Sequence, residues 1–153
     1  MRAKTIGIVG GVGPYAGLDI TRKVFDSTIA SADQEHLNVL LFSAPSEISD
    51  RTAFMLGRSA VNPAEGIFNM LKRMESAGVD VAAIACNTAH SPLIFDVVAD
   101  RLKRGKSRIE LVHMIREAAL FIKEHYQAIK RVGVLATDGT VKAGVYDAVF
   151  GKE

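Results

Sequence analysis

The single cysteine of this 153-residue chain lies where a thiol could do chemistry. Cys86 directly follows the apolar run Val79 to Ala85 and precedes Asn87 and Thr88. Free cysteine is often only a small buried hydrophobe, so packing is the alternative explanation. At the end of a strand and shortly before a helix, however, amide dipoles stabilise a thiolate and lower a thiol pKa that is ordinarily about 8.5. We therefore favour Cys86 as a reactive thiol with polar neighbours.

A glycine-rich loop follows the first apolar run. Gly11, Gly13 and Ala16 nearly match the G-x-G-x-x-A dinucleotide fingerprint. That fingerprint also needs an acidic residue after the second strand, where this sequence has Ser43 instead. A turn that lets helix and strand pack closely is a second interpretation. We favour a third, in which Gly11 helps to hold a small anion or carboxylate at a helix N-terminus.

A third polar loop contains Arg51 directly after Asp50. The pair could be a surface ion pair, or Arg51 could be a bidentate clamp for a ligand carboxylate. His90 follows the cysteine loop and could orient the site, cap a helix or transfer a proton. The remaining histidines have no metal-ligand spacing, so we expect no metal site; they are His36, His113 and His125.

Short aliphatic runs alternate with helical periodicity, a pattern that predicts βαβ units and a parallel sheet. The predicted strands are Lys4 to Val9, Leu37 to Phe42, Val79 to Ala85 and Arg131 to Ala136. Helices are predicted from Asn62 to Gly78 and from about Ser91 to Lys103. Ligands of such sheets bind beyond the carboxyl ends of the strands, where all three polar loops should meet.

The chain also begins to repeat itself. Lys4 to Gly13 aligns with Lys130 to Gly139, which superposes lysine, aliphatic and glycine positions. The match hints at two similar halves, and coincidence is an equal alternative because this opening is common in α/β units.

Composition narrows the class of protein. Apolar residues make up 48% and charged residues 24% of the chain, which predicts a globular protein. A net charge of +2 is too small to indicate a nucleic-acid partner, and we expect the basic run 101–108 to be a solvated helix end and loop. We expect neither a signal peptide nor a membrane span. A single cysteine favours the reducing cytoplasm.

Four motifs of the chain are informative in combination: TIGIVGGVGP at 5–14, SDRTAF at 49–54, ACNTAH at 85–90 and VLATDGT at 134–140. Together they resemble the aspartate/glutamate racemase superfamily, most closely its aspartate racemase branch. The resemblance covers essentially the whole chain. The glutamate racemase branch typically has Asp-Ser-Gly in the first loop, which here reads Gly-Gly-Val-Gly-Pro.

The resemblance implies a cofactor-independent isomerase that inverts the α-carbon of an acidic amino acid, with aspartate favoured over glutamate. Two similar α/β domains of such enzymes face each other, and a cysteine from each exchanges a proton on opposite faces of the substrate. Cys86 would be the acid/base of the first domain. Residues matching the family's substrate-binding positions are Arg51, Asn87, Thr88, Thr137, Gly139 and Thr140. Gly11, as the anion-binding residue of the first loop, would join them in holding the substrate.

The family's second cysteine has no counterpart here. We predict a complete first domain at 1–112 and the start of a second, incomplete domain at 113–153. Because its last strand would expose an edge, we expect a truncated form rather than a short one completed by another chain. Association into a homodimer is expected, since an unfinished domain leaves apolar surface. Alternatives are a non-catalytic amino-acid or dicarboxylate binding protein, and a one-cysteine dicarboxylate lyase or isomerase.

Overall fold

The computed structural model describes residues 3 to 151. Its strands are β1 (Thr5–Gly10), β2 (Asn38–Ser43), β3 (Val81–Ile84) and β4 (Glu110–Val112). Its α-helices are α1 (Pro14–Asp26), α2 (Arg51–Met55), α3 (Ala64–Ser76), α4 (Pro92–Arg104), α5 (Met114–His125), α6 (Asp138–Lys142) and α7 (Asp147–Phe150). Short 3-10 helices are η1 (Asp33–Glu35), η2 (Pro45–Glu47) and η3 (Thr88–His90).

The four strands form one parallel sheet in the order β2-β1-β3-β4. The α/β class and the first three strands are confirmed, with boundaries shifted by one or two residues. The fourth strand is not the predicted one. Residues 110–112 pair with β3 in parallel, but they are too few to show a strand period in the sequence.

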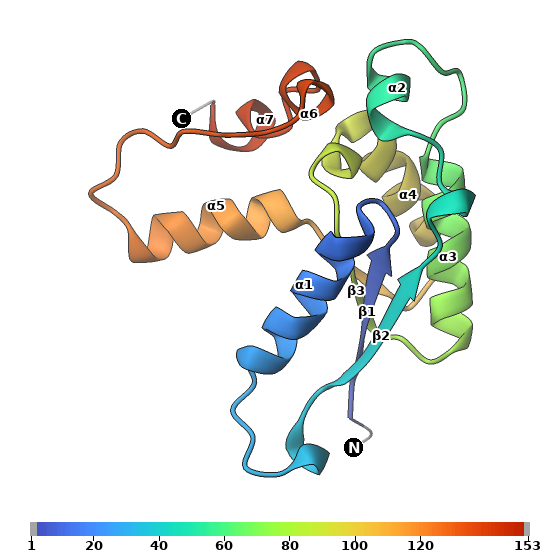
Figure 1. Ribbon diagram of the computed structural model, residues 1–153, viewed down its shortest axis with the longest axis vertical. Coiled ribbons are helices and arrows are strands. Elements are labelled where there is room, and N and C mark those ends of the chain that lie inside the picture. The colour runs from blue at the N-terminus through green and yellow to red at the C-terminus, as the bar shows by residue number, and fades with distance from the viewer. Residues whose placement is uncertain (1–2, 152–153) are drawn as a thin grey trace.

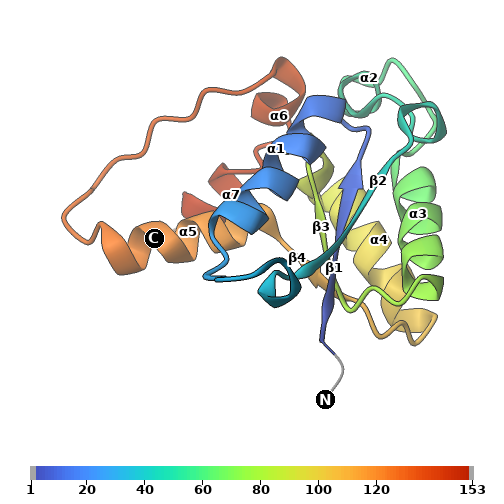
Figure 2. The same ribbon diagram turned by 60° about the horizontal axis from the view of Figure 1, so that its bottom comes forward.

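Helices cover both faces of the sheet, with α3 and α4 on one face and α1 on the other (Figures 1 and 2). The main core lies between the sheet and α3 and α4. It is built from fully buried aliphatic and methionine side chains, among them Val9, Ile67, Met70, Leu71, Met74, Val79, Ile84, Ile94 and Val98. The face under α1 is thinner, because Gly17 is the one buried residue of that helix.

Two helix predictions are confirmed. The Asn62 side chain accepts a hydrogen bond from the Ala64 amide (2.9 Å) and so caps α3, as expected. The helix α4 ends at Arg104, and residues 105–108 of the basic run lie in the loop to β4, as expected. None of the helices within residues 3 to 151 is long and apolar enough to cross a membrane.

The predicted strand Arg131 to Ala136 is wrong. This segment has no regular secondary structure, is exposed, and pairs with no strand in the described part of the chain. It forms a loop that leads away from α5 and back to α6, beside α2 (Figure 1). Aliphatic composition favours an extended backbone there, but a strand also needs a neighbour, which composition does not provide. The proposed repeat and the division at 113 stay predictions.

Candidate active site

Parallel pairing brings the three polar loops to one edge of the sheet. The loops after β1, β2 and β3 all begin at the carboxyl ends of strands, as predicted. Gly11 is buried in the first loop with a φ of +81°, and an added Cβ would lie 2.7 Å from the Pro45 amide nitrogen. The first and second loops therefore touch at a position that only glycine can occupy.

Cys86 lies two residues beyond β3, at the centre of this edge. Its side chain is half-buried and packs on one side against the main core, so part of the packing explanation holds. Both peptide groups of the residue are held. The Cys86 amide donates to the Ile84 carbonyl (2.8 Å), and the Cys86 carbonyl accepts from a ring nitrogen of His90 (2.8 Å). The thiol is thus carried on an anchored backbone.

His90 is almost fully buried, with 1% of its surface exposed. Its Nδ1 faces the Cys86 carbonyl, and its Nε2 accepts a hydrogen bond from the Met114 amide (3.1 Å). Burial lowers the pKa of His90 to about 4. Of the predicted roles, orientation and helix capping fit these contacts. Both ring nitrogens are occupied, which argues against direct proton transfer.

Arg51 is the first residue of α2. Asp50 does not pair with it and instead caps the helix, accepting from the amides of Thr52 (2.7 Å) and Ala53 (3.0 Å). Hydrogen bonds from the Ala53 and Thr52 amides lower the pKa of Asp50 despite slight desolvation. Arg51 donates from Nη1 to the Ser49 carbonyl (3.3 Å), while its Nε is buried with no hydrogen-bond partner among residues 3 to 151. The interpretation of Asp50 and Arg51 as a surface ion pair is therefore wrong. The buried Nε–H of Arg51 remains available to donate to an acceptor on a ligand.

The hydroxyls of Thr88 and Thr140 form a buried hydrogen bond of 2.7 Å. The hydroxyl of Thr137 forms a second hydrogen bond with the hydroxyl of Thr140, at 3.2 Å. These contacts join the cysteine loop to α6, which is 52 residues away in the sequence. Thr140 is 3% exposed, so its side chain faces Thr88 rather than open solvent.

Gly139 lies against the loop that carries Arg51. A Cβ at this position would be 2.7 Å from Thr52 Oγ1 and 3.0 Å from Thr52 Cα. The absence of a side chain is what allows α6 to dock on α2. Residues 137–140 therefore contact the cysteine loop at Thr88 and α2 at Thr52. That they complete a substrate cradle stays a prediction.

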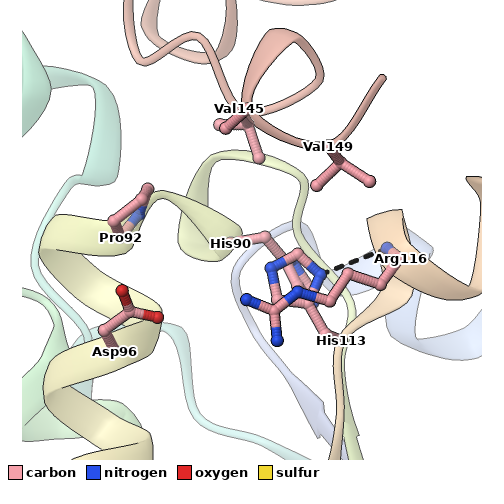
Figure 3. Close-up of a pocket in the computed structure, with 8 residues that line it drawn as sticks. His90, Pro92, Asp96, His113, Arg116, Val145 and Val149 are labelled. Atoms are coloured by element: carbon pink, nitrogen blue, oxygen red, sulfur yellow. Dashed lines mark hydrogen bonds between the residues drawn. The ribbon is translucent and has the colours of Figure 1, made fainter. Parts of the chain in front are cut away.

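A cavity of about 280 Å³ lies next to the cysteine loop (Figure 3). His90 and His113 line its centre, Pro92 and Asp96 of α4 lie on one side, and Val145 and Val149 of the C-terminal segment lie on another. Neither Cys86 nor Arg51 lines it. We therefore place the candidate site at the three loops. The cavity lies next to that site, on the other side of the His90 ring.

The predicted residues Gly11, Arg51, Cys86 and Thr88 all follow neighbouring parallel strands at one edge of the sheet. Residues 137–140 contact this edge at Thr88 and Thr52. Asn87 directly precedes η3, and its side chain makes no hydrogen bond within residues 3 to 151. Sequence reasoning missed Thr52 and the amide of Met114. The position of His90, four residues after Cys86, could have indicated a hydrogen bond from its ring to the Cys86 carbonyl.

Residues 9 to 152 match the protein family described as Asp/Glu/hydantoin racemase. The chain belongs to this family. Among curated proteins, a broad specificity amino-acid racemase (RacX) of Bacillus subtilis is 28% identical over 151 residues, which span 95% of this chain and 60% of that protein. The family assignment confirms the resemblance found in the sequence.

Solved structures of this racemase family have the same fold. An aspartate racemase of Picrophilus torridus superposes with a TM-score of 0.82 at 31% identity, over 97% of this chain and 59% of that one. An aspartate racemase homologue from Pyrococcus horikoshii superposes with a TM-score of 0.72 at 24% identity, over 97% of this chain and 61% of that one. The chain therefore spans about 60% of the length of these relatives.

Proposed function

We propose that this chain supplies one face of a cofactor-independent active site that exchanges the α-proton of an acidic amino acid, with aspartate as the favoured substrate. The observation that carries the proposal is that the loops of Cys86 and Arg51 and the buried Gly11 turn all begin at the carboxyl ends of neighbouring parallel strands. Membership of a racemase family and similarity to an aspartate racemase support it.

Cys86 would act as the acid/base. As thiolate it accepts the α-proton, and the electron pair of the broken C–H bond delocalises into the substrate carboxylate. As thiol it returns a proton to the same carbon. Inversion requires that the proton arrives from the opposite face, and the chain has no second cysteine to deliver it. A group other than Cys86 would have to supply that proton.

Arg51 would bind the side-chain carboxylate of the substrate. Its buried Nε–H has no acceptor within residues 3 to 151, and a guanidinium offers two parallel donors to a carboxylate. Asn87, whose amide group is uncommitted in the described structure, would contact the α-carboxylate or ammonium group. The hydroxyl of Thr88 already bonds to Thr140, so we expect Thr88 to act mainly by holding the loop.

The test is incubation of the 153-residue protein with L-aspartate in D2O, with α-deuteration followed by NMR and D-aspartate by chiral separation. Cys86→Ala should abolish deuteration. Arg51→Lys should weaken activity on aspartate but not on alanine, which has no side-chain carboxylate, because lysine lacks the guanidinium fork.

The pattern of products discriminates between mechanisms. Deuterated L-aspartate alone indicates exchange on one face by Cys86. Deuterated D-aspartate that disappears in Cys86→Ala indicates that a second group is supplied by the chain or its oligomer. Aspartate binding without deuteration would overturn the catalytic proposal and favour a binding protein.

A second candidate is a lyase or isomerase that uses one thiol on a dicarboxylate. Cys86 alone would suffice for it, since such a reaction needs no thiol on the opposite face. Turnover of maleate or a substituted malonate by wild-type protein, lost in Cys86→Ala and accompanied by no racemisation of aspartate, would replace the racemase proposal.

Homodimer formation stays a prediction. Apolar side chains of the C-terminal segment that would be available for it are exposed; they include Phe121, Ile129, Val132 and Leu135. Sedimentation velocity over a range of concentrations would give the oligomeric state directly.

A further inference from the structure

The buried ring of His90 is held from four sides. It stacks on Phe95 of α4, with ring centroids 5.2 Å apart and planes at 22°, and it contacts the edge of His113 at 4.8 Å. Its two nitrogens face the Cys86 carbonyl and the Met114 amide. One side chain thus connects the cysteine loop, α4 and the first residue of α5.

The two hydrogen bonds define the tautomer of this ring. A carbonyl only accepts, so Nδ1 must carry the proton that is donated to Cys86. A backbone amide only donates, so Nε2 must be bare to accept from Met114. The ring is neutral and both nitrogens are used, which leaves His90 no free site at which to receive a substrate proton.

The contact with Cys86 acts on the thiol through the backbone. The Cys86 amide is held by Ile84 and the carbonyl by His90, so the peptide planes on both sides of the residue are fixed. The Cα–Cβ bond that carries the thiol therefore has one direction. Without the His90 contact, the peptide between Cys86 and Asn87 would be free to rotate, and the half-buried thiol would reach solvent more often.

We propose that His90 is a positioning residue for Cys86, and that it acts through the Cys86 carbonyl while its other nitrogen ties the cysteine loop to the start of α5. The inference deepens the proposed function and rests on it only for its catalytic consequence. The geometric claim stands on the contacts alone.

Two substitutions separate the two hydrogen bonds. In His90→Asn, the amide nitrogen lies near the position of Nδ1 and retains a donor for the Cys86 carbonyl, while the contact with Met114 is lost. In His90→Gln, the longer side chain brings an oxygen near the position of Nε2 and retains an acceptor for Met114, while the donor to Cys86 is lost. A purely structural role predicts that both variants behave alike once folded.

The experiment measures two rates in folded wild-type and variant proteins, with circular dichroism as the check on folding. The first is alkylation of Cys86 by iodoacetamide, and the second is α-deuteration of aspartate. We expect alkylation to rise about fivefold in His90→Gln, because only this variant loses the buried hydrogen bond to the Cys86 carbonyl. In His90→Asn, which retains that donor, alkylation should stay within about twofold of wild type. Deuteration should fall by about fivefold or more in His90→Gln only.

The outcomes keep the two proposals apart. If wild-type protein deuterates aspartate but both variants change equally in both rates, His90 is not a positioning residue. If wild-type protein shows no deuteration but alkylation still separates the variants, the inference stands and the proposed function fails. Should both variants unfold, nitrogen NMR of wild-type protein decides, because protonation at Nε2 instead of Nδ1 would overturn the inference and protonation at Nδ1 would uphold it.

Discussion

The strand β3 and the segment 131–136 are both short aliphatic runs, yet they have opposite environments. In and beside β3, the side chains of Val79, Ala82 and Ile84 are completely buried. In 131–136, every residue is exposed, and Leu135 makes no packing contact that reduces its exposed surface. The strand β3 has β1 and β4 on its two sides, whereas 131–136 pairs with no strand within residues 3 to 151.

The difference shows which forces hold each region. The region around β3 is stabilised by a continuous apolar core between the sheet, α3 and α4. The C-terminal region, residues 131–151, is attached mainly by a few separate contacts. They are the hydroxyl pair of Thr88 and Thr140, the close approach of Gly139 to Thr52, and the buried side chain of Val145. We therefore expect the two regions to respond differently to the same type of substitution.

Truncating one buried and one exposed side chain tests this contrast most strongly. Ile84→Ala should lower the free energy of unfolding by about 3 kcal/mol, because it removes buried methyl groups and leaves a cavity. Leu135→Ala should change it by less than about 0.5 kcal/mol. Urea unfolding followed by circular dichroism measures both. A comparable loss in Leu135→Ala would show that 131–136 is packed in solution, for example against another copy of the chain.

The region around β3 could be predicted from the sequence much better than the C-terminal region. The common edge at which the loops of Gly11, Arg51 and Cys86 begin was predictable, because alternation of strands and helices implies parallel pairing and parallel strands end together. The fate of 131–136 was not, because pairing depends on strands distant in sequence. Nor could the sequence predict that the hydroxyl of Thr140 faces Thr88, since that contact depends on how α6 docks.

Acid should weaken the junction between the cysteine loop and α5. The folded state holds His90 with a pKa of about 4, below the ordinary value of 6.5, so the unfolded state binds more protons between these values. Stability is therefore complete above about pH 6.5 and falls as pH decreases towards 4. Between pH 7 and pH 5 we expect a loss of about 2 kcal/mol in the free energy of unfolding.

Urea unfolding at each pH measures this loss, with His90→Asn as the control. The variant should lose most of the pH dependence. A remainder belongs to His113, whose pKa is also lowered, chiefly by burial and then by the Arg116 charge. An unchanged slope in His90→Asn would show that other groups cause the acid sensitivity.

Adding one methyl group should loosen the C-terminal region without affecting the core. In Gly139→Ala, the new Cβ would lie 2.7 Å from Thr52 Oγ1, so α6 must shift at a cost of about 1.5 kcal/mol. Hydrogen exchange followed by mass spectrometry should show faster exchange in 137–150 and no change in β1 or β3. Gly133→Ala is the matched control, since no atom lies within 4 Å of its added Cβ. Equal effects of the two substitutions would show that docking does not depend on Thr52.

The smallest change removes one hydroxyl from the junction. Thr140→Val keeps the shape of the side chain but leaves the buried Thr88 hydroxyl without its 2.7 Å partner. Losing that hydrogen bond should weaken docking by about 1 kcal/mol, which corresponds to about fivefold faster amide exchange in α6. Thr140→Ser retains the hydroxyl and loses only a methyl group, so it should exchange more slowly than the valine variant. The reverse order would mean that apolar packing, rather than the hydroxyl pair, attaches the C-terminal region to the cysteine loop.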